Sequence, residues 1–303
     1  MKARTEKVEM QVAGIRISNP DRVIYAALGL TKLELAQYYE SVADWMLPHV
    51  AGRPLNLLRC PEGSGKPCFF QRHGHGTFPK AVKSLDVGGG EACVHIDSVA
   101  GLVALVQMGV LEIHPWGSKI DKLDRPDRMF FDLDPDPAVP WKRIVETAKL
   151  LHSMLGELGL ESFVKTTGGK GLHVVVPIAR RHTWDEIKAF SRGIADSLVR
   201  AAPDLYVATA SKSQRTRKVY IDYLRNARSA SSVGAYSTRA KEGAKVSTPI
   251  AWEEIDRAVN DQFDVQTVPI RLKKSKKDPW AGLLESKQAI SSTAMKSVTA
   301  NGR

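Results

Sequence analysis

The feature that most constrains the fold is an apolar segment with acidic residues at its end, MFFDLDPD at 129–136. Successive side chains of a strand point to opposite faces, so Asp132 and Asp134 share one face. Phe131 and Leu133 then lie on the other face, where they can pack in a core. The proline that follows cannot continue a central ladder and is expected to end the strand. The segment therefore predicts a strand with two carboxylates at its solvent-facing end.

A second segment, VYIDYL at 219–224, has the same alternation. It places Asp222 on one face and Val219 and Ile221 on the other. Three carboxylates from two strands suit a hard cation such as Mg²⁺ or Mn²⁺, with phosphate oxygens and water completing its coordination. Two such ions can activate a 3′-hydroxyl and stabilise a leaving pyrophosphate. A solvated strand end without metal stays open as the alternative, because short acidic motifs are common.

Basic charge is concentrated in parts of the chain. The 303 residues include 44 Lys and Arg against 33 Asp and Glu, a formal charge of +11. Nine basic and two acidic residues fall within 211–245, and five basic residues fall within 271–277. Localised positive charge suits a polyanion such as nucleic acid. A solvated basic surface is the alternative, and for 271–277 alone we favour it.

A glycine-rich turn joins two predicted strands in TTGGKGLHVVVP at 166–177. Its glycines allow a tight bend that can present N–H groups to an anion, and Thr167 and Lys170 add a hydroxyl and a positive charge. The spacing fits neither a Walker A loop nor a dinucleotide fingerprint. A plain hairpin turn is the alternative. His173 projects from the second strand, and an isolated histidine is more often structural than catalytic.

Two adjacent aromatic residues, Phe69 and Phe70, lie between Lys66 and Arg72. Such a pair among basic residues could stack on an unpaired base. Neighbouring strand residues face opposite sides, which favours exposure of one ring. Core packing of the pair remains the alternative. His114 in LEIHPW is a weaker candidate for a site residue.

The remaining segments predict a mixture of strands and helices without strict alternation, which indicates an α+β fold. Thr31 with Glu34 and Thr183 with Glu186 predict capping boxes that begin two amphipathic helices. A last helix is expected at 252–263. The end of the chain has few apolar residues, so we expect a flexible tail at 285–303.

Cysteine content and hydropathy indicate the environment. The three cysteines, Cys60, Cys68 and Cys93, have no CxxC spacing and argue against a disulfide framework or a cysteine zinc site. The longest apolar stretch, 99–111, is shorter than the roughly 20 residues of a membrane span. The segment at 1–15 lacks the apolar core of a signal peptide and is expected to be flexible. We therefore expect a soluble protein of a reducing compartment, without a membrane partner.

In combination, these segments resemble the archaeo-eukaryotic primase-polymerase superfamily, and more closely the polymerase module of bacterial ligase D. The resemblance rests on SNPDRVIY, the FF before RHGHG, LEIHPW, FDLDPD, TTGGKGLHVVVP and IDYLRN with GAYSTRA. These motifs follow one another from about residue 18 to about residue 250. The resemblance implies a primase-polymerase domain at 16–284, with a two-sheet core and an RRM-like catalytic subdomain flanked by helices.

The activity implied is that of a metal-dependent nucleotidyltransferase, a DNA polymerase module that adds ribo- or deoxyribonucleotides to DNA 3′ ends. It would fill gaps and extend ends in double-strand-break repair by non-homologous end joining. The resemblance implies Mn²⁺ or Mg²⁺, as two ions, and nucleoside triphosphates (NTP or dNTP) as substrate. It also implies ligase and phosphoesterase modules, a Ku-type end-binding partner, and a cytoplasmic, nucleoid-associated location.

The resemblance also implies roles for particular residues. Asp132 and Asp134 would bind both metals, Asp222 would bind the catalytic one, and Arg225 would organise the site. The incoming nucleotide would be held by His114, Thr167, Lys170, His173, Arg225 and Arg239. Broken or gapped DNA would be bound through its 5′-phosphate and template bases by Asn19, Arg22, Lys32, Lys66, Phe69 and Phe70. The chain departs from the family pattern in Thr167, where serine is frequent, and in Arg22, where lysine also occurs.

Two other functions fit the same residues. A non-catalytic module could bind 5′-phosphorylated DNA ends without releasing pyrophosphate. A metal-dependent nuclease would use the carboxylates but would need no triphosphate pocket. We find no KxDG-type ligase nucleophile, so this chain alone is not expected to seal nicks.

Overall fold

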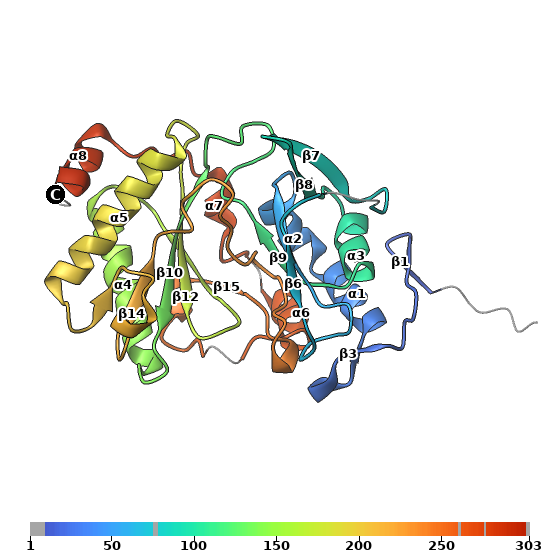
Figure 1. The fold of residues 1–303 in the computed structure, drawn as a ribbon. Helices are drawn as coiled ribbons and strands as arrows, with labels where there is room; N and C mark the ends of the chain where they lie inside the picture. Colours follow the sequence, from blue (N-terminus) through green and yellow to red (C-terminus); the bar gives the residue numbers. More distant parts are fainter. Residues whose placement is uncertain (1–9, 75–77, 260–261, 276, 301–303) are drawn as a thin grey trace, which may run out of the picture.

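The computed structural model describes residues 10–74, 78–259, 262–275 and 277–300. Two main sheets lie side by side (Figure 1). The central sheet has the order β13 (Tyr206–Val207), β14 (Val219–Asp222), β10 (Arg128–Pro135), β12 (Leu172–Pro177), β11 (Phe163–Thr166) and β15 (Pro249–Ile250). All of its neighbours are antiparallel except the β13–β14 pair.

The second sheet is built around β5. Its strands are β6 (Phe69–Gln71), β5 (Leu55–Arg59), β8 (Glu91–His95) and β7 (Lys83–Gly88), with β9 (Val110–Pro115) also paired to β5. Two small hairpins join β1 (Gln11–Val12) to β2 (Ile15–Arg16) and β3 (Val23–Tyr25) to β4 (Leu30–Thr31). The predicted flexible segment at 1–15 therefore contains part of a hairpin, and its residues 1–9 lie outside the described residues.

Helices cover the outer faces of the two sheets (Figure 1). The helices are α4 (Trp141–Glu157) and α5 (Trp184–Ala201) beside the central sheet, α1 (Lys32–Ser41), α2 (Ala43–Val50) and α3 (Val99–Gln107) beside the second, and α6 (Thr267–Lys274), α7 (Ala281–Glu285) and α8 (Ser292–Ala300), which follow later in the chain. In α4, Ile144, Ala148, Leu151 and Leu155 recur at helical spacing and are buried, so this stripe packs on the sheet. Across the described residues, no helix combines the length and apolar character needed to cross a bilayer.

Several local predictions are confirmed. The α+β class is observed, and Thr31 with Glu34 and Thr183 with Glu186 form complete capping boxes at α1 and α5. The glycine-rich turn joins β11 to β12 as an antiparallel pair. These features depend on residues close together in the sequence, which is why the pattern was sufficient to predict them.

The helix predicted at 252–263 is wrong for the described residues 252–259 and 262–263, and residues 260–261 lie outside the described part of the chain. The segment begins with a single 3-10 turn, Trp252–Glu254, and the next helix, α6, starts only at Thr267. Glu254 bonds back to the backbone N–H of Ala251 and forms an ion pair with Arg271, so it holds a turn instead of continuing a helix. The carboxylate of Asp264 accepts from the backbone N–H of Thr267 and thereby fixes the later start of α6.

The described part of the tail, 285–300, also differs from the prediction of a flexible segment at 285–303, and residues 301–303 lie outside the described residues. Helix α8 packs against α5, and Ala294 and Val298 are buried. Gly193 of α5 makes this contact possible, since a Cβ there would lie 2.5 Å from the carbonyl oxygen of Val298. Small apolar residues are enough for close helix packing when the partner is glycine, and a composition argument does not detect this.

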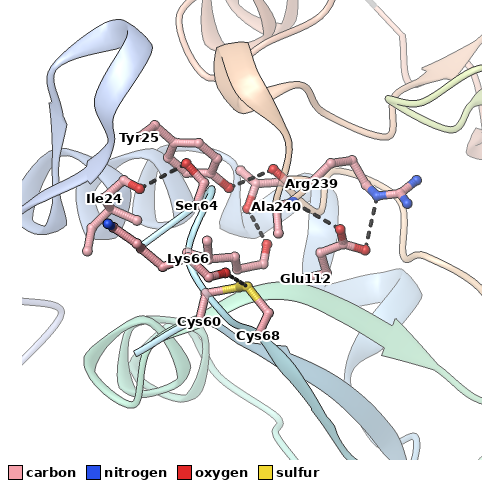
Figure 2. The surroundings of a disulfide bond; sticks show 11 residues. Ile24, Tyr25, Cys60, Ser64, Lys66, Cys68, Glu112, Arg239 and Ala240 are labelled. Atoms are coloured by element: carbon pink, nitrogen blue, oxygen red, sulfur yellow. Dashed lines mark hydrogen bonds and ion pairs between the residues drawn. A yellow bond between two sulfur atoms is a disulfide. The ribbon is translucent and has the colours of Figure 1, made fainter. Parts of the chain in front are cut away.

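The expectation that the cysteines form no disulfide is also wrong. Cys60 and Cys68 are bonded, whereas Cys93 is free and buried. Strands β5 and β6 pair with Arg59 opposite Phe69. Cys60, which follows β5, therefore lies opposite Cys68, which precedes β6, with their Cα atoms 4.4 Å apart. The hairpin register therefore brings the two thiols together (Figure 2).

Candidate active site

The centre of the site is a row of polar residues across four strands of the central sheet. Asp222 of β14 lies opposite Asp132 of β10, Asp132 lies opposite His173 of β12, and His173 lies opposite Lys165 of β11. Directly opposed residues of a sheet share a face and lie about 5 Å apart. Asp134 stands two residues beyond Asp132, on the same face and exposed. The register thus brings together the three predicted carboxylates.

Arginines balance these carboxylates. The Nε of Arg225 lies 3.2 Å from an oxygen of Asp222 and 3.8 Å from one of Asp132. An Nη of Arg215 lies 3.5 Å from Asp134 and its guanidinium stacks on the ring of Tyr220. Within the described residues, no three His, Cys, Asp or Glu side chains stand at metal-ligand spacing. The side chain of Arg225 is 45% exposed, so neighbouring residues enclose it only in part.

The carboxylates differ in their tendency to ionise. Asp134 is exposed, but partial desolvation at the cavity wall and the neighbouring negative charge of Asp132 raise its pKa. Burial likewise raises the pKa of Asp222 despite the nearby Arg225. Asp132 is half-buried, and desolvation opposes its ionisation, but interaction with His173, then Arg225 and Lys165, lowers its pKa to about 2. The site thus concentrates negative charge that two arginines neutralise only in part.

A cavity of about 730 Å³ opens beside the carboxylates. It is lined by the predicted site residues His114, Asp132, Asp134, Thr167, Lys170, His173, Arg225, Arg239 and Phe70, together with residues from Arg228 to Val233. Every residue predicted to hold a nucleotide therefore lies on one cavity wall or another. Its size and its excess of cationic groups suit a polar, anionic ligand.

The glycine-rich turn is packed tightly against the carboxylate strand. A Cβ on Gly171 would lie 2.0 Å from the carbonyl oxygen of Leu133, so only glycine fits there. The hydroxyl of Thr167 accepts from the backbone N–H groups of Gly169 and Gly171, at 3.1 and 3.3 Å. Thr167 thus stabilises the turn, and Lys170 remains exposed at the cavity.

Glu112 was not predicted from the sequence, although it holds two predicted residues. It is buried, and its carboxylate lies 2.8 Å from Nε2 of His114 and 3.0 Å from Nε of Arg239. It also accepts from the backbone N–H of Ala240, and the hydroxyl of Tyr25 donates to the carbonyl of Arg239 (Figure 2). The sequence did contain a signal, because Glu112 stands two residues before His114 on the same strand.

Lys165 was also missed. It is almost completely buried, and its Nζ donates to the hydroxyl of Ser247. Burial and the charge of Arg239 lower its pKa well below the usual value. A lysine within a short apolar strand gives no sign of burial in the sequence alone, because lysines are mostly exposed. Because Lys165 lies opposite His173, the face of the central sheet that carries the carboxylates also carries a lysine that the sequence did not predict there.

The residues predicted to bind a 5′-phosphate gather elsewhere. Asn19, Arg22 and Lys32 line a separate cavity of about 190 Å³. The ammonium of Lys32 donates to the carbonyl of Ser18, and burial followed by the charge of Arg22 lowers its pKa. Lys32 is buried close to the positive charge of Arg22, and an anion bound between the two side chains would relieve their repulsion.

The aromatic pair is more exposed than predicted. Phe69 is 49% and Phe70 52% exposed, whereas exposure of one ring was favoured. Phe70 lines the large cavity with its ring centroid 5.4 Å from that of His114, and Arg59 lies over Phe69. Lys66 is exposed within the disulfide-closed loop and lies outside the walls of both cavities described above.

Comparisons with known proteins agree on one family. The family model described as LigD, primase-polymerase domain, matches residues 31–280. The multifunctional non-homologous end joining protein LigD of Pseudomonas aeruginosa is 43% identical over 284 residues, covering 92% of this chain and 34% of that protein. The bifunctional LigD of Bacillus subtilis is 30% identical over 262 residues, covering 86% of this chain and 43% of that protein.

A solved structure agrees with these relatives. The polymerase domain from Mycobacterium tuberculosis ligase D, in complex with DNA, superposes with a TM-score of 0.82 at 29% identity. The superposition covers 90% of this chain and 99% of the solved polymerase domain. By contrast, this chain spans about a third of the length of its curated relative from Pseudomonas aeruginosa. With the family model matching most of its length, this chain belongs to the LigD primase-polymerase domain family.

Proposed function

We propose that this chain is a metal-dependent nucleotidyltransferase that adds ribo- or deoxyribonucleotides to DNA 3′ ends. One observation carries the proposal: Asp132, which lines a large cavity together with cationic and histidine side chains, lies directly opposite Asp222 on the neighbouring strand. The names of the relatives support a role in non-homologous end joining, with gap filling and end extension as the reactions. Ligase and phosphoesterase modules, a Ku-type partner and a nucleoid location are part of the same proposal.

The donor chemistry of the carboxylates suits divalent cations, although their present spacing does not form a ready metal site among the described residues. Asp132, Asp134 and Asp222 offer hard oxygen donors on one face, which Mg²⁺ or Mn²⁺ prefers. Desolvation, followed by the negative charge of Asp132, raises the pKa values of Asp134 and Asp222, and a nearby divalent cation would offset both effects. When bound, two such ions would activate a primer 3′-hydroxyl and offset the charge of the leaving pyrophosphate.

The other residues have separable roles in this proposal. Lys170 and Arg239 lie at the cavity with cationic groups that can pair with triphosphate oxygens. Arg239 is aimed by Glu112 and by the carbonyl of Thr167, to which it donates at 2.7 Å. His173 lies 3.3 Å from Asp132 and holds that carboxylate in place. Positioning of this kind supplies most of the catalysis in phosphoryl transfer.

DNA would contact two further surfaces. The cavity with Asn19, Arg22 and Lys32 would bind a 5′-phosphate, and the exposed ring of Phe70 would stack on a template base. The related solved polymerase domain was obtained with DNA, which supports DNA as the partner class.

The test is extension of a gapped, 5′-phosphorylated duplex with Mn²⁺ and labelled nucleoside triphosphates. We expect extension by the native chain and a loss of at least about 100-fold in Asp222→Asn, in line with removal of an electrostatic catalytic group. Asp256→Asn, an exposed acidic residue that pairs with Lys149, is the matched control.

Three outcomes discriminate the functions. Full extension by Asp222→Asn would refute the proposal. Tight, salt-sensitive binding of DNA ends without pyrophosphate release would identify a binding module instead. Shortening of the labelled DNA without any need for triphosphate would identify a nuclease.

A further inference from the structure

A third cavity, of about 260 Å³, lies at the start of β10, away from the carboxylates. Its charged lining residues are Arg53, Lys119, Asp127, Arg128, Arg180 and Lys287, and α7 closes one side with Leu283. Arg128 precedes Asp132 by four residues of strand, which separates the two by about 13 Å. This cavity is therefore distinct from the candidate active site.

Two guanidinium groups of this cavity are buried. Arg53 is 1% and Arg128 4% exposed. Arg53 forms a bidentate ion pair with Asp127, with both N–O distances at 2.6 Å, and Arg128 donates to the carbonyl of His49 at 3.1 Å. Among the described residues, neither Nε of Arg53 nor Nη2 of Arg128 has a hydrogen-bond partner. Buried donors without partners are rare and costly, so each needs an explanation.

The charges around the cavity do not balance. Five cationic side chains line it against the single carboxylate of Asp127. Asp127 pairs with Arg53, and Asp121 pairs with Arg180. Among the described residues, this leaves Lys119, Arg128 and Lys287 without a carboxylate at ion-pair distance. Burial and the charge of Arg53 lower the pKa of Arg128 to about 9, so it still carries a proton at neutral pH. A purely structural ion pair would need Arg53 and Asp127 alone, not a second buried guanidinium flanked by two lysines.

We propose that this cavity binds a phosphate-type oxyanion, either free phosphate or pyrophosphate or a backbone phosphate of bound nucleic acid. A tetrahedral oxyanion matches forked guanidinium donors and carries enough charge to offset the excess. The volume accommodates one such anion with its remaining water. The site goes beyond the proposed function, because it involves none of the residues assigned to catalysis, to the nucleotide or to the 5′-phosphate.

The test follows arginine Nε–Hε resonances by NMR on the full chain, without nucleoside triphosphate or Mn²⁺. Inorganic phosphate is titrated against sodium chloride of equal ionic strength, and a DNA duplex without terminal phosphates is titrated separately. We expect saturable movement of the Arg53 resonance. Binding should weaken about tenfold in Lys119→Gln/Lys287→Gln, which removes two nearby exposed charges. Lys142→Gln/Lys273→Gln, with the same charge change at exposed positions outside the cavity, should bind as the native chain does.

Each outcome has one reading. A shift of the Arg53 resonance with inorganic phosphate supports a free anion as ligand. A shift with the duplex but not with inorganic phosphate supports a backbone phosphate. No movement with either probe, or equal weakening in both double variants, overturns the proposal. Because the titration is independent of nucleotide addition, its failure would leave the extension assay and the proposed function untouched.

Discussion

Replacement of Glu112 by glutamine should destabilise the fold in a pH-dependent way. Burial raises the pKa of this carboxyl, but the bond from His114 and the charge of Arg239 outweigh burial and lower it from 4.5 to about 2. A shift of this size corresponds to roughly 3 kcal/mol of stabilisation at neutral pH. Burial also lowers the pKa of His114, which is then neutral at pH 7, so part of that attraction is absent there. We therefore expect Glu112→Gln to lose about 2 kcal/mol, within the range for bonds to charged groups.

The sign of the pH dependence follows from the lowered pKa. The stabilisation is fully present above the unfolded pKa of 4.5 and is lost as pH falls toward about 2. Urea unfolding of the native chain and Glu112→Gln should thus give a difference of about 2 kcal/mol at pH 7 that becomes smaller at pH 3.5. Glu157→Gln, an exposed acidic residue at the end of α4, is the matched control and should change little at either pH. Equal stability of Glu112→Gln and the native chain at pH 7, or a difference independent of pH, would refute the reasoning.

Three further predictions test other parts of the molecule. Gly171→Ala should lower the free energy of unfolding, measured in urea, by about 1–3 kcal/mol, because the added Cβ would meet the Leu133 carbonyl. Gly156→Ala, where the added Cβ would point into open space, should leave that free energy unchanged or raise it. Equal effects of the two substitutions would contradict the close packing of the turn. Cys68→Ser should lower the free energy of unfolding by about 2–3 kcal/mol under oxidising conditions, as expected for a short disulfide loop, and by much less in the presence of a reductant. A decrease in this free energy that is the same with and without reductant would argue against the disulfide. Lys32→Gln should reduce the preference for 5′-phosphorylated over unphosphorylated gapped DNA in a competition binding assay, and an unchanged preference would remove Lys32 from that site.

Local sequence determined the elements that position the site. Alternation in two short segments was enough to predict which faces of β10 and β14 carry Asp132, Asp134 and Asp222. The two capping boxes and the glycine turn were equally accessible. All of these depend on the period of a strand or on bonds between residues three or four apart, so the information lies within a few residues.

Tertiary structure alone decided which of these elements meet. Strand order and register put Asp222 opposite Asp132, 90 residues earlier in the chain, and bring Lys165 and His173 into the same row. Register also pairs Cys60 with Cys68, although these two residues are only eight positions apart in one hairpin. These placements follow from packing and register, and a pattern within one segment carries no record of the partner it will face.

Helix α8 gives the same lesson from the end of the chain. Its few small apolar residues predicted no packing, yet Val298 is buried because Gly193 of α5 leaves room for it. Likewise, the buried arginines beside Asp127 were indistinguishable in the sequence from the many exposed ones. The sequence by itself determined local conformation and the chemistry available, whereas burial and proximity, which convert that chemistry into sites, came only from the folded chain.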